Sequence, residues 1–515
     1  MSRLPTLWKA NLIAFSSSFC VMVIELVAAR ILAPYIGVSL YTWTSIIGVI
    51  LAGIALGNYL GGKLADRRPS PILLMLIFFA GALATILILP TTKIVAQGDW
   101  FGKLPVMWNF ALKTSFIFFL PAIILSMVSP MVIKLTLVDL GRTGGIVGTI
   151  YAFSAAGAIL GTFLTGFYLI LWFGTAALVW LVASTLILTG ILTWLVWTPH
   201  KFKFSTKNFL IWMAIFEVIL AAAILYQFRS RWEKPWDIES SYYAIRVLPG
   251  EKGMKLLVLD DLIHSYVDPQ DPTKLEYFYL RVFEGIVRRT LGDTPPRTLH
   301  LGAGGYSFSR YLETVYPGSI NHVVEIDPAV TQISYEQLGL SRATSIKTFN
   351  MDARQFFIRR VTGDKYDIVI GDVFNSRSAP YHLTTREFDQ LIEDSLSPKG
   401  IYLLNIIDDF RSGRYMASLI YTLQQVFQNV HLFNTGRAWE DVRVSTYVVV
   451  ATNYDYDFSV YKAPTITPDG KLEPYGRIYD GDLAFYLADR KAVLLTDDYA
   501  PTDILIAPSL ARMRL

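Results

Sequence analysis

Two hydropathy patterns divide this 515-residue chain near residue 228. Before that point long apolar stretches follow one another, and most have about the 20 residues that a helix needs to cross a bilayer. The first stretch is too long for a cleavable signal peptide, and more stretches follow it. We therefore predict a transmembrane domain at residues 1–228 with about seven spans, at 11–33, 41–62, 71–91, 108–128, 144–172, 174–197 and 208–227.

Glycines recur at four-residue spacing in two of these stretches. Gly53, Gly57 and Gly61 form one set, and Gly157 and Gly161 form the other. Small residues at this spacing let two helices in lipid approach closely. We expect both sets to lie at helix–helix contacts.

The distribution of basic residues indicates how the predicted spans are oriented in the membrane. Lys63 and Arg67 follow the second predicted span, and more basic residues follow the fourth and sixth, whereas the loops after the first and fifth have none. The positive-inside rule then places the N-terminus in the cytoplasm. Seven spans would put the rest of the chain outside, but Pro121 and Pro130 could instead make residues 104–136 a broken hairpin, which gives an even count.

Two acidic residues, Glu25 and Glu217, fall inside predicted spans. Ionisable groups are costly in a membrane and often mark a functional path. One interpretation is a path for cations or polyamines through the helices. The alternative is a structural ion pair, or a side chain that reaches the bilayer surface from near a helix end.

From residue 237 onward the pattern changes. Residues 237–290 alternate apolar and polar positions in short runs, which is typical of a small β-domain. In residues 297–515, strands alternate with helical stretches up to about residue 452, which predicts a parallel sheet. The predicted fold class is thus an N-terminal multi-pass α-helical membrane domain, then a small β-domain, then a C-terminal α/β Rossmann-like domain of the S-adenosylmethionine-transferase type. Near the end, DDYAPTD forms either a loop that closes on a site or a surface turn.

Glycines and acidic residues end four successive predicted strands of the α/β region. Gly302 and Gly304 follow the first, and Glu325 and Asp327 follow the second; the last two are followed by Asp352-Ala353 and by Asp372. In an open α/β sheet, ligands bind at the carboxyl ends of the strands. A glycine turn with an acid about 20 residues later is typical of a nucleotide-type site. We expect these residues to face one crevice.

The choice of nucleotide follows from the last two strand ends. An NAD site would explain the glycine turn and Glu325, but not Asp352 or Asp372, and Ser307 stands where its third glycine is expected. A ligand of the S-adenosylmethionine type explains all four strand ends. The glycines would lie near its amino-acid tail, with Glu325 at the ribose, Asp352 at the adenine amine and Asp372 at the sulfonium.

The motifs also resemble a known family. LHLGAGGYSFSRYLE, VVEIDPAV, NMDARQFF, YDIVIGDVFNSRSAPYHLTTREF and LSPKGIYLLNI, with SSYYAIRVL and LLVLDDLIHSY upstream, are similar to the aminopropyltransferase (spermidine synthase) family over residues 237–455. With the apolar half and LTDDYAP near the end, the chain resembles the membrane-fused spermidine synthase-like group. The resemblance implies transfer of an aminopropyl group from decarboxylated S-adenosylmethionine to putrescine or another amine, with methylthioadenosine as the leaving product.

The resemblance also implies residue roles. Asp372 matches the catalytic aspartate, Glu325 the ribose-binding acid, Asp352 and Ala353 the adenine-contacting pair, and Tyr277 a tyrosine that contacts the amine. It further implies a cytoplasmic catalytic domain at the inner membrane, because the donor is an intracellular nucleoside, and a homodimer at the level of the family.

Four positions depart from the family pattern. Gly305 replaces an aspartate that anchors the aminopropyl tail, Asn375 a second aspartate, His264 a glutamine, and Phe278 a His or Gln. Charge-assisted hydrogen bonds contribute roughly 1.5–3 kcal/mol each, so a doubly charged diamine would lose substantial affinity. Tyrosines at 242, 243, 306 and 381, with His264 and His382 as possible bases, could instead line a more apolar or cation–π site.

Composition narrows the remaining possibilities. The net charge is +4 with no basic stripe, which argues against a nucleic-acid partner. The six histidines show no ligand-like spacing, so no metal site is expected, and the single cysteine, Cys20, excludes a disulfide within the chain. Three hypotheses stay open: a membrane aminopropyltransferase, another S-adenosylmethionine-dependent transferase such as a methyltransferase, or a polyamine transporter or sensor with a nucleoside-binding domain.

Overall fold

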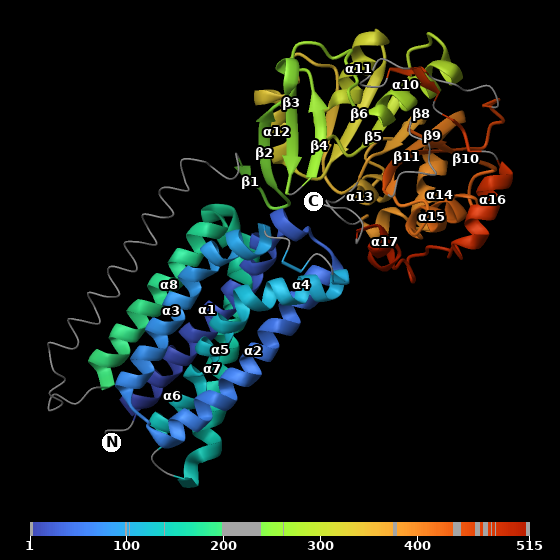
Figure 1. The fold of residues 1–515 in the computed structure, drawn as a ribbon. Helices are drawn as coiled ribbons and strands as arrows, with labels where there is room; N and C mark the ends of the chain where they lie inside the picture. The colour runs from blue at the N-terminus through green and yellow to red at the C-terminus, as the bar shows by residue number, and fades with distance from the viewer. Residues whose placement is uncertain are drawn as a thin grey trace. The chain divides into compact units, whose positions relative to one another are not determined.

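The computed structural model describes residues 4–97, 100–101, 104–137, 140–197, 238–260, 262–373, 379–435, 444–458, 464–466, 472–474, 476–478 and 480–510. The chain is divided into two compact units, Met1–Ser241 and Tyr242–Leu515 (Figure 1). Residues 198–237 lie outside the described parts, so the predicted span at 208–227, Glu217 and the far end of the 1–228 domain are not addressed by the structure.

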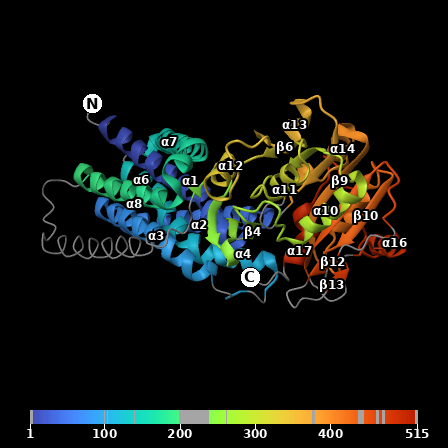
Figure 2. The same ribbon diagram turned by 90° about the horizontal axis from the view of Figure 1, so that it is seen from above.

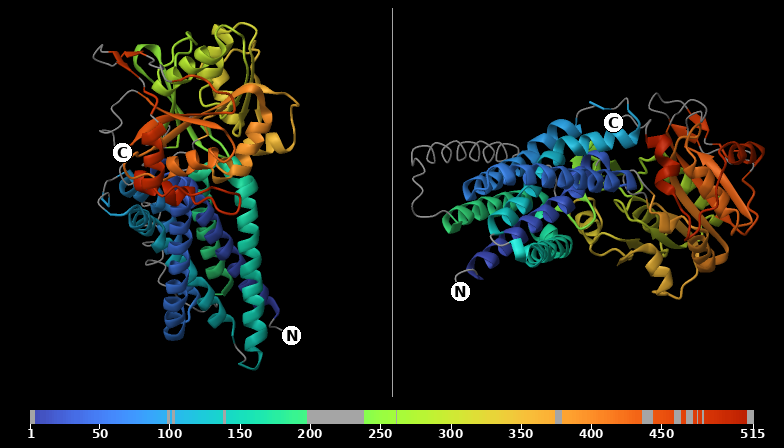
Figure 3. Two further views of the ribbon diagram at one scale, coloured as in Figure 1. Left: turned by 90° about the vertical axis from the view of Figure 1, so that its right-hand side faces the viewer. Right: turned by 90° about the horizontal axis from the view of Figure 1, so that it is seen from below.

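The first unit is a bundle of long apolar helices that run side by side (Figure 3). Six helices among the described residues are long and apolar enough to cross a membrane: Leu7–Ile36, Leu40–Arg67, Pro71–Val95, Met107–Thr136, Leu140–Leu169 and Trp172–Leu195. The elements are α1 (Leu4–Ile36), α2 (Leu40–Arg67), α3 (Pro71–Gln97), α4 (Val106–Thr114), α5 (Leu120–Ser126), α6 (Val128–Thr136), α7 (Thr143–Leu164) and α8 (Ile170–Trp197), with π turns at Ser115–Phe119 and Thr165–Leu169, a 3-10 turn at Leu140–Arg142, and strand β1 (Ile238–Glu239) at the end of the unit.

Of the two alternatives for residues 104–136, a single span or a broken hairpin, the structure shows the single span. Met107–Thr136 forms one helical span, in which a π-helical turn joins α4 to α5. Pro121 lies in the first turn of α5 next to this π turn, where its missing N–H is tolerated. The prolines therefore adjust the local helix geometry without reversing the chain.

The glycine sets lie at helix contacts, as the spacing predicts. A Cβ atom on Gly57 would lie 2.2 Å from the carbonyl oxygen of Ile123 in α5, and one on Gly157 would lie 2.2 Å from the carbonyl oxygen of Phe15 in α1. Only glycine allows backbones to approach so closely. These contacts join α2 to α5 and α7 to α1.

Three consecutive serines of α1 bond to three other helices. The Ser16 hydroxyl lies 3.1 Å from that of Thr189 in α8, Ser17 donates to the Leu125 carbonyl in α5 at 3.3 Å, and Ser18 lies 2.5 Å from Ser154 in α7. Polar bonds of this kind stabilise helix association in an apolar environment. The half-buried Glu25 forms no ion pair with any residue that the structure describes.

The second unit begins with a small antiparallel sheet, β2 (Ala244–Pro249), β3 (Lys255–Leu259) and β4 (Leu262–Val267). The predicted β-domain at 237–290 is too long, because the strands end at Val267 and residues Phe278–Leu291 form helix α10. Its buried residues recur at helical spacing: Tyr279, Val282, Phe283, Ile286 and Val287.

A seven-stranded sheet forms the centre of the second unit, in the order β10-β11-β9-β8-β5-β6-β7. Strands β5 to β8 and β9 are parallel, and β10 and β11 are antiparallel to their neighbours. The strands are β5 (Arg297–Leu301), β6 (Ile320–Glu325), β7 (Lys347–Asn350), β8 (Tyr366–Gly371), β9 (Leu396–Asp408), β10 (Asn429–Asn434) and β11 (Ser445–Thr452), with a separate hairpin of β12 (Pro464–Ile466) and β13 (Leu472–Pro474). The predicted Rossmann-like fold is confirmed.

Helices cover this sheet, and one face packs α10 and α11 (Ser307–Val315) against apolar residues of β8, β9 and β11. The other helices are α12 (Pro328–Gln337), α13 (Ala353–Ile358), α14 (Arg386–Ser395), α15 (Tyr415–Leu423), α16 (Asp480–Asp489) and α17 (Thr502–Leu510). Helices α13 and α14 lie next to each other (Figure 2). Strand β5 is the switch point, since the chain adds β6 and β7 on one side of it and β8 on the other. A crevice at the carboxyl end of β5 is the expected ligand site of such a sheet.

Candidate active site

The glycine loop after β5 is built by the close approach of two strand ends. Gly302 and Gly304 have φ angles of +85° and +48°, in the left-handed region that glycine tolerates. A Cβ on Gly302 would lie 2.3 Å from the carbonyl oxygen of Asp372, at the end of β8. Gly302 thus allows the loop and the Asp372 strand end to lie against each other.

Strand β4 of the small sheet covers the same loop. The N–H of Gly305 donates to Ser265 Oγ at 2.8 Å. A Cβ on Gly305 would lie 2.5 Å from Cγ2 of Val267. The position at which the resemblance implies an anchoring aspartate is therefore covered by β4, which explains why a glycine stands there.

Glu325 lies buried at the end of β6, and its carboxylate ties the glycine loop to the next turn. It accepts the N–H of Ala303 and the N–H of Asp327, both at 2.9 Å. Burial raises the pKa of Glu325 to about 7, against the opposing effect of these two N–H donors. Asp327 is also buried and caps α12 by accepting the N–H of Ala329 at 2.9 Å.

Asp352 and Ala353 begin α13, on the same edge of the sheet. One carboxylate oxygen of Asp352 caps the helix through the N–H of Gln355 at 3.0 Å, and the other lies 2.8 Å from Nε2 of His382. The hydrogen bond from His382 holds the pKa of Asp352 below its usual range. Ala353 is buried.

Asp372 is half-buried at the end of β8 and is held by two side chains. Tyr279 of α10 donates its hydroxyl to Oδ2 at 2.7 Å, and Asn405 of β9 donates from Nδ2 to Oδ1 at 2.9 Å. Burial raises the pKa of Asp372, while both hydrogen bonds favour the ionised form. The result is a fixed carboxylate that can accept a proton.

Tyr279 and Asn405 were not predicted from the sequence. Tyr277, which the resemblance places near the amine, donates its hydroxyl to the Ile263 carbonyl at 2.7 Å, and its ring centroid lies 5.5 Å from that of Tyr279. Asn405 follows Leu404, which pairs with Gly371. Asn405 thus lies level with Asp372, but β9 continues to Asp408, so the strand-end rule that selected Asp372 does not select Asn405.

The other residues expected to bind the amine come from the region of the small sheet and from the segment after β8. The half-buried rings of Tyr243 and His264 lie 6.4 Å from each other, and burial together with nearby Glu325 raises the pKa of Tyr243. Tyr381 is 58% exposed, next to His382. Asn375 lies outside the described residues.

A cavity lies between the glycine loop and α10. Its wall is apolar at Phe283, Phe308 and Ile370, and polar at Ser265, Ser307 and His300. Burial lowers the pKa of His300 to about 3, so this side chain is neutral. Among the described residues that line the cavity, Asp372 supplies the one carboxylate.

Comparisons with known proteins place the chain among its relatives. No family model matches the chain. The polyamine aminopropyltransferase of Vibrio vulnificus is 35% identical over 250 residues, which are 47% of this chain and 79% of that protein. The eEF1A lysine and N-terminal methyltransferase of Bos taurus is 27% identical over 124 residues, which are 22% of this chain and 18% of that protein. The solved structure of a probable spermidine synthase from Corynebacterium glutamicum has a TM-score of 0.43 and 22% identity, covering 50% of this chain and 95% of that one.

The identity to the Vibrio protein extends over most of that protein's length. It covers about half of the present chain. The chain belongs to the polyamine aminopropyltransferase (spermidine synthase-like) family and is a transferase.

Proposed function

We propose that this protein is a membrane-bound aminopropyltransferase. It would move the aminopropyl group of decarboxylated S-adenosylmethionine to an amine such as putrescine or another polyamine, and would release methylthioadenosine. The observation that carries the proposal is the Asp372 carboxylate, held by Tyr279 and Asn405 beside the Gly302 loop. Membership in the family supports the class of reaction.

The chemistry needs a proton acceptor next to the reacting carbon. The amine nitrogen forms a C–N bond to the propyl carbon while the C–S bond breaks, and the electron pair of that bond goes to sulfur. The amine then loses one proton, which Asp372 would accept. The raised pKa of Asp372 favours proton uptake, and the hydrogen bonds from Tyr279 and Asn405 keep it ionised beforehand.

The donor nucleoside would lie along the strand ends. Glu325 would accept the ribose hydroxyls, with Gly302 and Gly304 leaving room for the aminopropyl tail. Asp352 and Ala353 would contact the adenine, and Asp327 would support this turn by capping α12. A resident metal is not required by this chemistry, because the sulfonium already activates the carbon.

The amine would be bound largely by aromatic side chains. Tyr266 and Tyr277 meet edge to face at 5.0 Å, and Tyr243 lies against His264. Rings attract an ammonium group through cation–π contacts. Tyr381 and Asn375 would complete this acceptor site from the segment that follows β8.

The decisive variant is Asp372→Asn in the full-length protein in detergent. We expect turnover to fall at least 100-fold, while the dissociation constant of methylthioadenosine changes less than threefold, because the base is lost but the nucleoside contacts remain. Asp293→Asn on the exposed surface after α10 is the matched control and should retain full turnover. Unchanged turnover in the Asp372 variant would remove Asp372 from the mechanism.

A methyl transferase is the second candidate. Gly305 leaves the donor tail without its anchoring aspartate, and Ser307 Oγ is buried near the loop with no hydrogen-bond partner among the described residues. A site with hydroxyl groups and a helix N-terminus in place of an aspartate can accept a donor that retains its carboxylate. A relative that is named as a methyltransferase is similar to about a fifth of the chain.

We further propose that the first unit spans the inner membrane and that the catalytic unit faces the cytoplasm. Large apolar side chains stay exposed on its helices, including Leu51 at 56%, Ile159 at 58% and Phe163 at 56%, as lipid contact requires. Cys20 is the one cysteine of the chain and is buried, so Asp293→Cys in a Cys20→Ser background gives a single label site. Labelling by a membrane-impermeant maleimide only after cell lysis is expected, and labelling in intact cells would contradict a cytoplasmic catalytic unit.

A further inference from the structure

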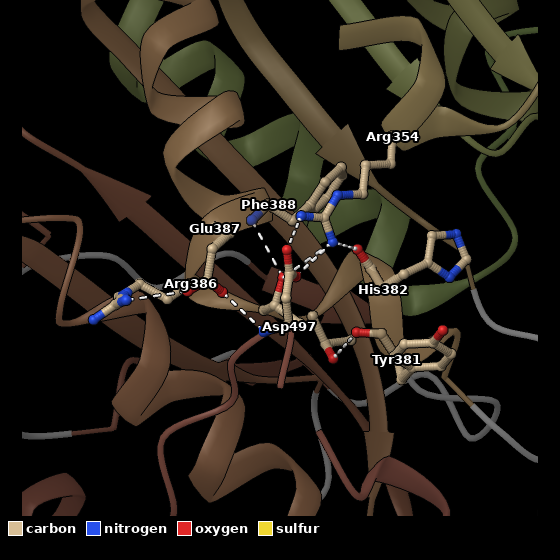
Figure 4. Close-up of polar contacts among 9 residues, drawn as sticks. Arg354, Tyr381, His382, Arg386, Glu387, Phe388 and Asp497 are labelled. Atoms are coloured by element: carbon tan, nitrogen blue, oxygen red, sulfur yellow. Dashed lines mark hydrogen bonds and ion pairs between the residues drawn. The ribbon is translucent and has the colours of Figure 1, made fainter. Parts of the chain in front are cut away.

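The segment Leu495–Pro501 is bonded into the α/β unit next to α13 and α14 (Figure 4). The Asp497 carboxylate accepts Nη1 of Arg354 at 2.6 Å and also accepts Nη2, so the guanidinium and the carboxylate form a two-pronged pair. Such pairs fix orientation as well as distance. Residues 496–499 form a turn whose residues 497–499 are exposed, as the surface-turn alternative expects, and this turn is tied to α13 and α14.

Further hydrogen bonds hold the same segment through Asp497 and Leu495. Thr385 Oγ1 donates to Asp497 at 2.8 Å, and the N–H of Asp497 donates to Glu387 at 3.0 Å. The carbonyl of Leu495 accepts the N–H of Arg386 at 2.9 Å. The segment is thus attached to the first turn of α14 by both its side chain and its backbone.

Arg354 connects this attachment to the donor site. It lies on α13 two residues after Asp352, and its Nη1 also donates to the carbonyl of His382 at 3.1 Å. The His382 ring in turn lies 2.8 Å from Asp352. A continuous series of polar contacts therefore joins Asp497 to Asp352 through Arg354 and His382.

The charges around Arg354 make it the centre of this network. Asp497, Glu387 and Asp352 all act on its guanidinium and raise its pKa, with the Asp497 hydrogen bond as the largest cause. The Arg354 side chain is 16% exposed, so solvent screens these contacts only in part. Without this cation, three carboxylates would repel one another and the turn that carries His382 would lose its anchor.

The geometry points to Asp497 and Arg354 as positioning residues of the donor site: they fix the turn that carries His382, so that His382 holds the Asp352 carboxylate in place for the nucleobase. This inference rests on the proposed function, because it takes Asp352 as the adenine contact. It assigns a role in donor binding to a segment far along the chain from the strands that form the site.

The test uses Asp497→Asn and Arg354→Lys in the full-length protein in detergent. Each variant keeps approximate size but breaks the two-pronged pair. We expect the dissociation constant of methylthioadenosine and the KM for the donor to rise about tenfold, while the KM for the amine and kcat change less than threefold. Asp480→Asn at the start of α16 is the matched control, because it breaks the ion pair of Asp480 with Arg477, and it should leave donor binding unchanged.

The combination of the two variants sharpens the test. If both residues act through one contact, the double variant should bind methylthioadenosine about as weakly as each single variant. Unchanged methylthioadenosine binding in Asp497→Asn would overturn the inference. An equal rise of both KM values together with lower thermal stability would also overturn it, because that pattern indicates a general structural role.

Failure of the proposed function would give a different pattern. S-adenosylhomocysteine carries the same adenosine, and its binding is measured in parallel. A wild-type protein that binds S-adenosylhomocysteine and releases no methylthioadenosine would refute aminopropyl transfer. A tenfold weaker affinity of Asp497→Asn for S-adenosylhomocysteine would still support the positioning role.

Discussion

Replacing Gly302 with alanine would place a methyl carbon 2.3 Å from the carbonyl oxygen of Asp372. Real Cβ atoms essentially never come within 3.0 Å of such an atom, so the two strand ends would have to separate by the difference, 0.7 Å or more. The Cβ is fixed to the backbone of residue 302 and the Asp372 oxygen is itself backbone, so neither atom can rotate away. The perturbation therefore acts on the position of Asp372 itself.

Two energetic costs contribute to the expected loss of stability in the Gly302→Ala variant. Alanine at φ +85° costs about 1–2 kcal/mol, because L residues disfavour the left-handed region. Forcing an extra methyl group against backbone costs about 1–3 kcal/mol more. Displacing a catalytic group by about 1 Å costs about 100-fold in rate. We expect the variant to lose about 2–5 kcal/mol of stability and about 100-fold in kcat.

Gly318→Ala separates the two costs, since Gly318 has φ +90° and open space where its Cβ would lie. Pulse proteolysis in urea gives the stability of both variants in the full-length protein, and product release gives kcat. Gly318→Ala should lose only the conformational cost and retain turnover. If Gly302→Ala loses no more stability than Gly318→Ala and keeps its kcat, the close approach of the two strand ends does not position Asp372.

Two further predictions concern the nucleoside and the membrane unit. Because the pKa of Glu325 is raised to about 7, its carboxylate is half protonated at neutral pH when no ligand is bound. Ribose hydroxyls need the ionised form, so the affinity for methylthioadenosine should rise about tenfold from pH 6 to pH 8. The Glu325→Gln variant should bind methylthioadenosine weakly, with no such rise. Equal pH profiles in both proteins would contradict this role. Gly57→Ala should lower the melting temperature of the detergent-solubilised protein by several degrees, because its Cβ would lie 2.2 Å from the Ile123 carbonyl oxygen, whereas Gly62→Ala, with open space, should not. Equal melting temperatures would refute the α2–α5 contact.

The strand ends of the site were predictable from the sequence, because they depend on one topological rule. Parallel strands of an open sheet end at the same edge, so Gly302, Glu325, Asp352 and Asp372 come together whatever the exact packing is. The spacing of the glycines in the first unit is predictive for a similar reason. Close helix contacts in an apolar environment need small residues on one helix face.

The contacts that complete the site were harder to predict, because they depend on where a helix begins. Tyr277 is the residue that precedes α10, and Tyr279 lies in its first turn. Successive helical residues are rotated by about 100°, so a shift of two positions points a side chain to nearly the opposite face. The buried apolar residues of Phe278–Leu291 recur at helical spacing, so the end of the β-domain before this helix was predictable from the sequence.

The contacts from distant segments have no local signal at all. Ser265 and Val267 reach the glycine loop from a different sheet, and Asp497 reaches Arg354 across 143 positions of the chain. From the sequence alone, Gly305 indicated only that an aspartate for the aminopropyl tail was missing. In the structure, Ser265 and Val267 of β4 occupy the space that a side chain at residue 305 would need.

The most direct test of the account is product analysis with the purified full-length protein. S-adenosylmethionine and its decarboxylated form are supplied separately with a panel of amines, and the nucleoside that is released is identified. The account predicts methylthioadenosine from the decarboxylated donor, together with an amine extended by one aminopropyl group. Release of S-adenosylhomocysteine from S-adenosylmethionine, with no methylthioadenosine from either donor, would contradict it and would identify a methyl transferase.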